Sequence, residues 1–586
     1  AEAPWGFGRV CPQTRRRLWE MLQGTTINRK GDVDTMKKFL TLALALLMVC
    51  MMLPVVAMAE EGAEGAGASN GPVEVWTGYT GTKVGSYDSI EDAVNNLGTN
   101  KWIVIGGNYT ITKDFTIPEG VFLDVARDAI LTVDNGITLT VAADAKRLGV
   151  RTGATLVNNG TIVVCGTDYN NGKVMVQDGA VFDTTALSVP EGHFLDKNGS
   201  NYFATEVSKA EYEITFNDGT IILTAYKTNA KGGNVKQIKL LKDVSTGGWP
   251  IDTSVGSDVI LDLNGHTVRY DGTNTRSCTL NISTKVTIKG GTVEYTGTAS
   301  GAIQSTGNLT IASDAIIDGG AGYGVWTDGY GHTLTVNGTI ISNGYYAITS
   351  NGSENGNLVT DSSIIINKGA VVSVPNGIAI YHPEKGTVTI NGGEISGHTG
   401  VEMCAGDLIV NGGSITSTGA NMNATGSQNA IMDGAAISVI NRNYPGGIPT
   451  AKINGGTIRA TGNGALAVKA YDYKGDVVAE WMDASEYVEV NGGTFYGEVN
   501  DLEKYIPETS EVVSGESDGF VVRPKNTTIV IIRPTEEEKP AEDTKNPNTG
   551  ANDLVGVAVA LAVAALVSGA AVSMKKDKVQ FTRDYT

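Results

Sequence analysis

Aromatic side chains gather in one stretch of the chain where they could recognise a sugar. In a chain with 7 Trp and 11 Phe, three consecutive glycine-punctuated repeats hold Tyr323, Trp326, Tyr330, Tyr345, Tyr346 and Tyr381. Exposed rings beside a carboxylate such as Asp328 can stack on sugar faces or anchor a protein partner. The sequence therefore predicts a ligand-binding patch of Trp326, Tyr330 and Tyr381. The alternative is that these rings pack against inserted loops.

Residues that could catalyse a reaction are scattered. His332 lies near aromatic and acidic neighbours, but solvent exposure is the simpler interpretation, and Arg442 does not fall beside aligned carboxylates. A glycoside hydrolase needs two carboxyl groups about 5–10 Å apart, which distant repeats could supply without a trace in the sequence. The sequence assigns no catalytic residue, and a polysaccharide lyase or hydrolase stays open as the alternative.

Cysteine spacing argues against a disulfide framework or a zinc site, because no C-x-x-C pair occurs. The cysteines are Cys11, Cys50, Cys165, Cys278 and Cys404. Two of them fall in a segment predicted to be removed, which leaves an odd and widely spaced three. No metal and no cofactor are predicted.

These candidate residues would sit on a periodic array of short strands. Asn–Gly turns or their variants begin at Asn264, Lys289, Ser313, Asn337, Asn367, Asn391, Asn411, Asp433, Asn454 and Asn491. Most intervals are about 20 to 25 residues, a length that suits one coil of a parallel β-solenoid. Asn and Gly accept the positive φ that a tight corner needs. Each coil would bury its apolar face by stacking on the next.

Alternation with period two predicts which residues face the core. Two inward columns are expected: Tyr323, Tyr346, Ile378, Val401 and Leu466, and then Val325, Ile348, Ile380, Met403 and Val468. Two outward columns are expected: Gly324, Ala347, Ala379, Glu402 and Ala467, and then Trp326, Thr349, Tyr381, Cys404 and Lys469. The repeat near Asn429 fits this register poorly.

Composition agrees with a β-solenoid and excludes several classes of protein. Glycine contributes 75 of 586 residues without a G-X-Y period, so collagen is excluded. A hydrophobic content of 41% argues against wholesale disorder. The formal net charge is −19, so nucleic acid is not an expected partner, since phosphate binding needs a basic surface.

The N-terminal segment has the features of a secretory signal. Met36 is followed by two lysines and an apolar run, and Ala57 and Ala59 supply small residues before a polar stretch. This order predicts a signal peptide over 36–59 that is cleaved after Ala59. Residues 1–35 are interpreted as an upstream extension.

The C-terminal segment combines three features in a fixed order. The pentapeptide Asn546, Pro547, Asn548, Thr549, Gly550 precedes an apolar run from 554 to 574 and a lysine-rich tail. The run is long enough to span a bilayer, and the lysines would hold its end in the cytoplasm. The segment resembles the sorting signal of Gram-positive surface proteins, with Asn546 where the usual motif has leucine. The resemblance implies that a sortase cleaves between Thr549 and Gly550 and joins Thr549 to peptidoglycan.

The repeats resemble a pectin-lyase-like right-handed parallel β-helix. The stretch from Ile238 to Val244, which leads to Leu261–Asp262–Leu263–Asn264–Gly265–His266–Thr267, resembles the opening coils of such helices in bacterial surface proteins. The resemblance covers about 237–500 and more loosely 88–185. It implies an all-β fold and leaves function open, because the scaffold carries lyases, hydrolases and adhesins alike.

These features predict an order of domains. A linker over 60–72 and an N-terminal β-solenoid-like module over 73–200 come first. A connector over 201–235 leads to a parallel β-helix over 236–505, followed by an acidic, disordered Pro- and Glu-rich spacer over 506–545 and the sorting signal over 546–586, which holds one apolar helix. Within the first module, Ser89 and Asp92 suggest a capped short helix, and within the connector Asn217–Gly219 suggest a hairpin turn.

The predicted function is that of an extracellular, cell-wall-anchored adhesin that binds a glycan or a host surface without enzymatic activity. Its partners would be a sortase and peptidoglycan, and it would meet the membrane only through the C-terminal span before sorting. A wall-tethered lyase or glycoside hydrolase and a passive surface spacer are the alternatives.

Overall fold

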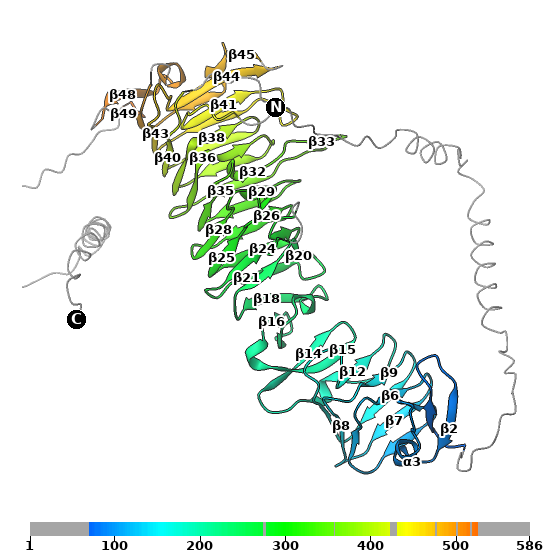
Figure 1. The fold of residues 1–586 in the computed structure, drawn as a ribbon. Coiled ribbons are helices and arrows are strands. Elements are labelled where there is room, and N and C mark those ends of the chain that lie inside the picture. Colours follow the sequence, from blue (N-terminus) through cyan, green and yellow to red (C-terminus); the bar gives the residue numbers. More distant parts are fainter. Residues whose placement is uncertain are drawn as a thin grey trace, which may run out of the picture. The chain divides into compact units, whose positions relative to one another are not determined.

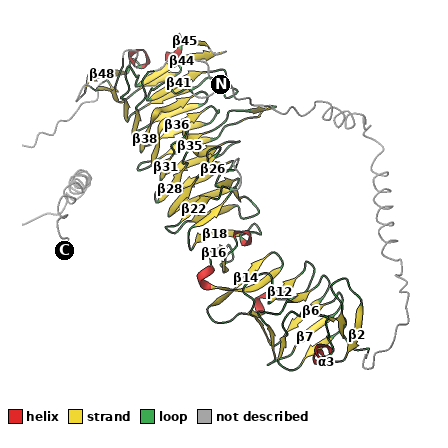
Figure 2. Cartoon of the chain, in the orientation of Figure 1, coloured by secondary structure: helices red, strands yellow, loops and turns green. Residues whose placement is uncertain are grey.

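The structure is a computed structural model that describes residues 70–525, apart from 273–276, 357, 422–430, 475–476, 500–501 and 516–518. Strands make up about half of these residues, and helices are few and short (Figures 1 and 2). The fold is all-β and solenoid-like, as predicted, with long sheets built chiefly of parallel strands. Two stacks are described in turn: the N-terminal stack, residues 73–206, and the main stack, residues 212–524.

The N-terminal stack has three sheets around one apolar core. The largest contains β1 (Val73–Trp76), β2 (Lys83–Tyr87), β3 (Trp102–Ile105), β6 (Phe122–Val125), β9 (Arg147–Val150), β12 (Lys173–Val176), β14 (His193–Asn198) and β15 (Asn201–Glu206). The second contains β4 (Tyr109–Ile111), β7 (Ile130–Val133) and β10 (Thr155–Asn158). The third contains β5 (Phe115–Ile117), β8 (Thr138–Val141), β11 (Thr161–Val164) and β13 (Leu187–Ser188).

The short helix expected near Ser89 is present as α3 (Ile90–Asn95). The Ser89 hydroxyl accepts a hydrogen bond from the Asp92 backbone N–H, which satisfies one of the free donors at the start of the helix. Ile90 and Ala93 are buried and pack into the core of the N-terminal stack.

The main stack contains two long sheets. One is formed by β16 (Tyr212–Phe216), β17 (Ile221–Thr224), β18 (Val235–Leu240), β21 (Asp258–Asp262), β24 (Lys285–Lys289), β27 (Leu309–Ile311), β30 (Thr333–Val336), β35 (Ser363–Ile366), β37 (Thr387–Ile390), β39 (Asp407–Val410), β42 (Thr450–Ile453) and β46 (Val488–Val490). From β18 to β46 its neighbours are parallel, as expected for stacked coils.

The other sheet wraps the remaining sides of each coil. It begins with β19 (Val244–Thr246), β20 (Trp249–Ile251), β22 (Thr267–Tyr270), β23 (Leu280–Ile282), β25 (Gly291–Glu294), β26 (Gly301–Ser305), β28 (Ala315–Asp318), β29 (Tyr323–Thr327), β31 (Thr339–Ile341) and β32 (Tyr346–Thr349). It continues with β36 (Val371–His382), β38 (Glu394–Met403), β40 (Ser414–Ser417), β41 (Ile437–Asn441), β43 (Thr457–Ala460), β44 (Val468–Lys474), β45 (Val477–Glu480), β47 (Gly493–Tyr496), β48 (Ser510–Ser514) and β49 (Phe520–Pro524). A small hairpin of β33 (Glu354–Asn355) and β34 (Leu358–Val359) is inserted beside it.

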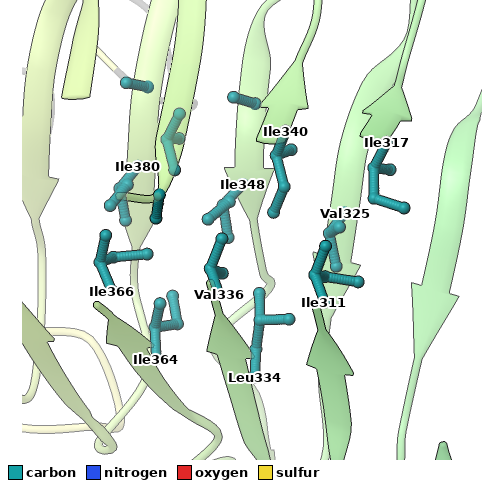
Figure 3. Close-up of a cluster of buried hydrophobic side chains, with 14 of the residues drawn as sticks. Ile311, Ile317, Val325, Leu334, Val336, Ile340, Ile348, Ile364, Ile366 and Ile380 are labelled. Atoms are coloured by element: carbon teal, nitrogen blue, oxygen red, sulfur yellow. The ribbon is translucent and has the colours of Figure 1, made fainter. Parts of the chain in front are cut away.

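Aliphatic side chains from successive coils form continuous rows inside the main stack. Figure 3 shows Val325, Ile348 and Ile380 in one such row, facing a second row formed by Ile311, Val336 and Ile366. All six are fully buried. Because each row runs across several coils, the apolar surface of one coil is covered only when the next coil is in place.

An asparagine ladder runs along one corner of the main stack. Asn367, Asn391, Asn411, Asn454 and Asn491 each donate from Nδ2 to Oδ1 of the preceding asparagine, and the first acceptor is Asn337, at distances of 2.9 to 3.2 Å. Six of the predicted turn positions therefore stack directly. The ladder joins Asn411 to Asn454, so the two short repeats expected around Asp433 form one coil of 43 residues.

The predicted alternation is wrong at one corner of the coil. Ala347, Ala379 and Ala467 lie in the core, although they were expected to face outward, whereas Tyr346 and Ile378 pack in a separate cluster outside it. The reversal of the inward and outward columns is explained by the limited space inside the coil at this corner. A Cβ added to Gly324 in the same column would lie 2.5 Å from Ile340 Cγ2. Only small side chains fit inward there, so two consecutive residues of each strand face the core.

The boundaries of the predicted domains also differ from the structure. The connector over 201–235 contains β15, which belongs to the N-terminal stack, and the β16–β17 hairpin, which opens the main stack with its turn at the predicted Asn217–Gly219. At the other end, β48 and β49 extend the main stack into the segment assigned to the spacer. Short, locally bonded strands of this kind lack the coil period on which the boundaries were based.

Candidate functional site

An outward-facing column on the larger sheet of the main stack carries two of the three predicted binding residues, Trp326 and Tyr381. The register places Trp326 between Gln304 and Thr349, and farther along it aligns Tyr381, Glu402, Ser438 and Lys469. Adjacent strands in a sheet are about 4.8 Å apart, so the column is a continuous track. The column lies on the outer face of the sheet, whereas Val325 and Ile348 lie on the inner face, in the core. We call this outer face the outer flank.

One member of this column was predicted incorrectly. In the register of β36 and β38, Glu402 pairs with Tyr381. The predicted column had Cys404 at this position. The pairing of β36 with β38 shifts between Val374 and Ile378, because β36 holds two extra residues there. A shift of two residues preserves the alternation of faces, so the sequence pattern alone could not reveal it.

Trp326 lies next to the Asp328 carboxyl, which is near Glu384, and Tyr330 and His332 lie on the turn that follows. We call Trp326, Asp328, Tyr330, His332 and Glu384 the Trp326 patch. Tyr330 lies on the turn after β29 and is 43% exposed, whereas Trp326 and Asp328 are half-buried. Tyr323 packs edge-on against Trp326, with ring centroids 5.4 Å apart, and so fixes the orientation of the indole.

The turn that carries Tyr330 has a defined conformation. Gly329 has φ of +117°, and a Cβ there would lie 2.9 Å from His332 Cδ2, so glycine is needed at this position. The Gly331 N–H donates to Asp361 Oδ1, and the Asp361 N–H donates to Gly329 O. These bonds tie the turn that carries Tyr330 and His332 to the next coil.

The two carboxyl groups of the patch lie in a partly dehydrated environment. Burial raises the pKa of Glu384 to about 7, and the nearby Asp328 carboxylate adds to the rise. Burial also raises the pKa of Asp328 above its ordinary value. Glu384 Oε2 accepts hydrogen bonds from both the N–H and the hydroxyl of Ser362, which position its side chain. Glu384 can therefore gain or lose a proton near neutral pH.

Tyr381 does not present a free ring. It is 8% exposed and stacks on Tyr346, with ring centroids 5.5 Å apart, and its hydroxyl lies 3.4 Å from that of Tyr444. This placement corrects the prediction of Tyr381 as an exposed contact: its ring lies outside the solenoid core, as expected, but the 43-residue coil covers it. Tyr346, expected in the core, packs in the same outer cluster.

A second polar cluster lies beside Tyr381 and was missed by the sequence analysis. We call Glu402, Cys404, Asp433, Arg442 and Tyr471 the Glu402 cluster. Glu402 and Asp433 are both buried. The Ile431 N–H donates to both oxygens of Glu402, and Asp433 accepts from Ser438 Oγ, Tyr471 OH and the Ala435 N–H. Each carboxyl therefore anchors the covering segment around Ile431–Ala435 to the sheet.

Arg442 lies near the Glu402 carboxyl, which corrects the expectation that it would not fall beside a carboxylate. Its guanidinium is 5.0 Å from the Tyr444 ring centroid and 4.8 Å from that of Tyr473, and it acts electrostatically on Glu402. The one sequence signal for the cluster was a glutamate inside the apolar run Val401–Ala405. Asp433 and Arg442 come from distant parts of an irregular coil, and no periodicity links them to Glu402.

The Glu402 cluster should make stability depend on pH. Burial, and secondarily Asp433, raise the pKa of Glu402 from 4.5 to about 8. A carboxyl whose pKa is raised on folding stabilises the fold fully below its unfolded pKa, and this contribution is lost as the pH rises from about 4.5 to 8. The buried His382, whose pKa burial lowers to about 4, acts in the opposite sense only up to about pH 6.5. Urea midpoints measured from pH 6.5 to 8.5 should therefore fall, and Glu402→Gln should flatten that fall.

A matched control is Glu394→Gln, which changes an exposed glutamate of the same strand. It should leave the pH profile as in the unmodified chain. Glu384, with its own raised pKa, leaves a residual slope in every variant. An undiminished fall in Glu402→Gln would show that Glu402 is not the titrating group.

The remaining predicted sites lie outside the described residues. They are the signal-peptide positions Ala57 and Ala59, and the sorting pentapeptide Asn546, Pro547, Asn548, Thr549 and Gly550. Within the part of the chain that the structure describes, no group of three or more His, Cys, Asp or Glu side chains could hold a metal ion. Among the described helices, none has the length and apolar character needed to cross a bilayer.

Comparison with known proteins adds no identification. The chain matches no protein-family model, no curated protein and no solved structure. The functional assignment therefore depends on the residues and contacts described above.

Proposed function

We propose that the chain is a secreted surface protein of a Gram-positive bacterium that a sortase attaches to peptidoglycan. Its main stack is a right-handed parallel β-helix of the pectin-lyase-like kind, and the acidic segment up to 545 lifts the stack off the wall. The order of signal peptide, strand repeats, Pro- and Glu-rich segment and C-terminal pentapeptide supports this organisation. In this proposal the main stack is the part that meets the environment.

The function we propose is binding of an extracellular or host glycan at the Trp326 patch, without cleavage. The observation that carries it is the half-buried Trp326 on the outer flank, next to the Asp328 carboxyl, with His332 and the exposed Tyr330 on the turn that follows β29. Aromatic faces next to carboxylate and imidazole groups provide stacking surface and hydrogen-bond partners for sugar hydroxyls. The two long sheets fix the spacing of these groups across neighbouring coils.

A second candidate function is hydrolysis or lysis of a polysaccharide at the same patch. It is favoured by the raised pKa of Glu384, about 7, next to the Asp328 carboxyl. Such a pair could divide the roles of acid and base between them. Because Glu384 is fully buried and bonded to Ser362, binding remains the better-supported function.

The binding proposal predicts a clear effect of removing both rings. Trp326→Ala combined with Tyr330→Ala should weaken glycan binding at least about tenfold, because each stacked ring contributes on the order of 1 kcal/mol. The measurement is a glycan-array screen with the full chain, followed by titration of the strongest ligand. Phe520→Ala, which removes a comparably exposed ring near the C-terminal end of the main stack, is the control.

Thermal unfolding of the double variant would be measured alongside, to separate lost contacts from lost folding. Undiminished glycan binding in a folded Trp326→Ala/Tyr330→Ala variant would contradict the proposal. Absence of any saccharide ligand for the unmodified chain would favour the passive spacer instead.

A further inference from the structure

The outer face of the largest N-terminal sheet carries a column that changes from aromatic to basic. The register aligns Trp102, Phe122, Arg147 and Lys173 on β3, β6, β9 and β12. Trp102 and Phe122 are stacked, with ring centroids 3.8 Å apart and an angle of 5° between their planes. Arg147 Cζ lies 5.3 Å from each ring centroid, so its guanidinium lies beside the stacked pair. Parallel pairing thus places guanidinium and aromatic groups on one face.

A buried carboxylate holds two arginines in place on this face. Asp124 is fully buried and accepts from Trp102 Nε1 at 2.9 Å, from Nε and Nη2 of Arg147 at 2.9 and 2.8 Å, and from Nε and Nη2 of Arg151 at 3.3 and 2.8 Å. Room for the carboxylate comes from Gly149, where an added Cβ would lie 2.0 Å from Asp124 Oδ1. The guanidinium groups are therefore preorganised.

The cluster carries more positive than negative charge. One carboxylate faces two guanidinium groups whose side chains are only 13% and 21% exposed. Lys173, aligned beside Arg147, is offset electrostatically by Asp168, so the excess comes from the two arginines over Asp124. Each arginine uses Nε and Nη2 on Asp124, and its Nη1 makes no hydrogen bond within the described part of the chain. A partly desolvated excess of positive charge favours an anion.

An exposed tyrosine covers the arginines and supplies an apolar surface. The Tyr79 ring centroid lies 4.6 Å from Arg151 Cζ and 5.8 Å from Arg147 Cζ, and Tyr79 is 48% exposed. It also packs at an angle against Trp102. The site thus places a solvent-facing ring next to two fixed guanidinium groups.

We propose that this cluster, Tyr79, Trp102, Asp124, Arg147 and Arg151, binds a saccharide that bears a carboxylate. The sugar ring packs against Tyr79, and its carboxylate accepts hydrogen bonds from the arginines. The net charge of −19 disfavours a densely charged polyanion, whereas one carboxylate per sugar suits a local positive charge of this size. This site is separate from the Trp326 patch and does not depend on the function proposed for it.

The test uses two ligands that differ only in the carboxylate. Saturation-transfer NMR and titration of the full chain would compare 4-nitrophenyl β-D-glucuronide with 4-nitrophenyl β-D-glucoside. We expect the glucuronide to bind at least about tenfold more tightly, as charge-assisted hydrogen bonds to arginine imply. Equal binding of the two ligands, or binding of neither, would overturn the proposal.

Variants then locate the binding site. Arg151→Gln leaves Asp124 bonded to Arg147 and Trp102, so the stack should fold, and glucuronide affinity should fall at least about fivefold. Tyr79→Ala should weaken both ligands, and Arg151→Lys should restore only part of the loss, since lysine lacks the planar fork. Arg127→Gln, at an exposed arginine of the same stack, should have no effect.

Two further comparisons distinguish this saccharide site from the Trp326 patch and from a site for acidic peptides. Trp326→Ala/Tyr330→Ala should not change glucuronide binding, and a loss there would assign the ligand to the main stack instead. N-acetylglutamate methylamide should compete poorly because it has a carboxylate but no sugar ring. Competition as strong as that of the glucuronide would identify an acidic peptide site and overturn the saccharide assignment.

Discussion

Thr549→Ala is expected to abolish attachment of the protein to the cell wall. In the proposed sorting reaction, the bond between Thr549 and Gly550 is cleaved and the Thr549 carbonyl is joined to a peptidoglycan amine. Without recognition of the pentapeptide, the chain would keep residues 550–586, and the apolar run over 554–574 would hold it in the membrane fraction. The loss should be nearly complete, because no second motif of this kind lies upstream of the apolar run.

Mass spectrometry of wall digests provides the measurement. In the unmodified chain, a peptide ending in Thr549 linked to a peptidoglycan fragment is expected. Thr544→Ala, five residues upstream of the motif threonine, should be sorted normally. A wall-linked peptide that still contains Gly550, or an unchanged wall fraction in Thr549→Ala, would contradict the proposed cleavage.

Gly324→Val should destabilise the main stack by about 3 kcal/mol or more. The Cβ alone would lie 2.5 Å from Ile340 Cγ2 and 2.6 Å from the Ala347 carbonyl oxygen. The second contact is with backbone and cannot be relieved by a change of rotamer. Valine would therefore separate two stacked coils at the corner where the core admits only small side chains.

This substitution discriminates between the two assignments of the corner column. If position 324 faced solvent, as period-two alternation predicts, valine would be neutral or stabilising in a strand. Thr335→Val, a nearly isosteric change on the outer face of β30, is the control and should shift stability little. Urea denaturation of both variants provides the measurement, and an unchanged midpoint for Gly324→Val would restore the outward assignment.

The coil period was predictable because the same physical requirements recur on every coil. Asn411 and Asn454 are recognisable as corner residues, since a tight turn and a side-chain amide ladder both favour asparagine. The core row of Val325, Ile348 and Ile380 follows from the same repeat. The strand from Trp102 to Ile105 in the N-terminal stack is a short apolar run between turn residues, a pattern that is visible in the sequence.

What escaped prediction depends on contacts between residues without a common period. The corner reversal at Ala347 and Ala379 arises from limited space inside the coil, which alternation does not encode. The shift in β36 moves Glu402 beside Tyr381 without changing which face either residue occupies. The burial of Tyr381 results from the 43-residue coil, whose spacing was read as two ordinary repeats.

The residues of the candidate sites also differ in whether their contacts could be predicted from the sequence. Trp326, Tyr330 and Asp328 are close in sequence, so their proximity could be predicted from one turn. Glu384 joins them from two coils farther along, and Asp124 brings Arg147 and Arg151 together across two neighbouring coils of the N-terminal stack. Such partners are set by the register of the stack, which the sequence pattern fixes only to within a few residues.

The most direct test of the central claim, that the Trp326 patch binds a glycan without cleaving it, is product analysis after binding. The full chain would be incubated with the strongest saccharide ligand from the array, and the bound fraction would be released and analysed by mass spectrometry and by assays for reducing and unsaturated ends. The account predicts that the ligand is recovered intact, with its affinity lost in Trp326→Ala/Tyr330→Ala. Release of shortened sugars that stops in Glu384→Gln would contradict it and would identify the patch as an active site.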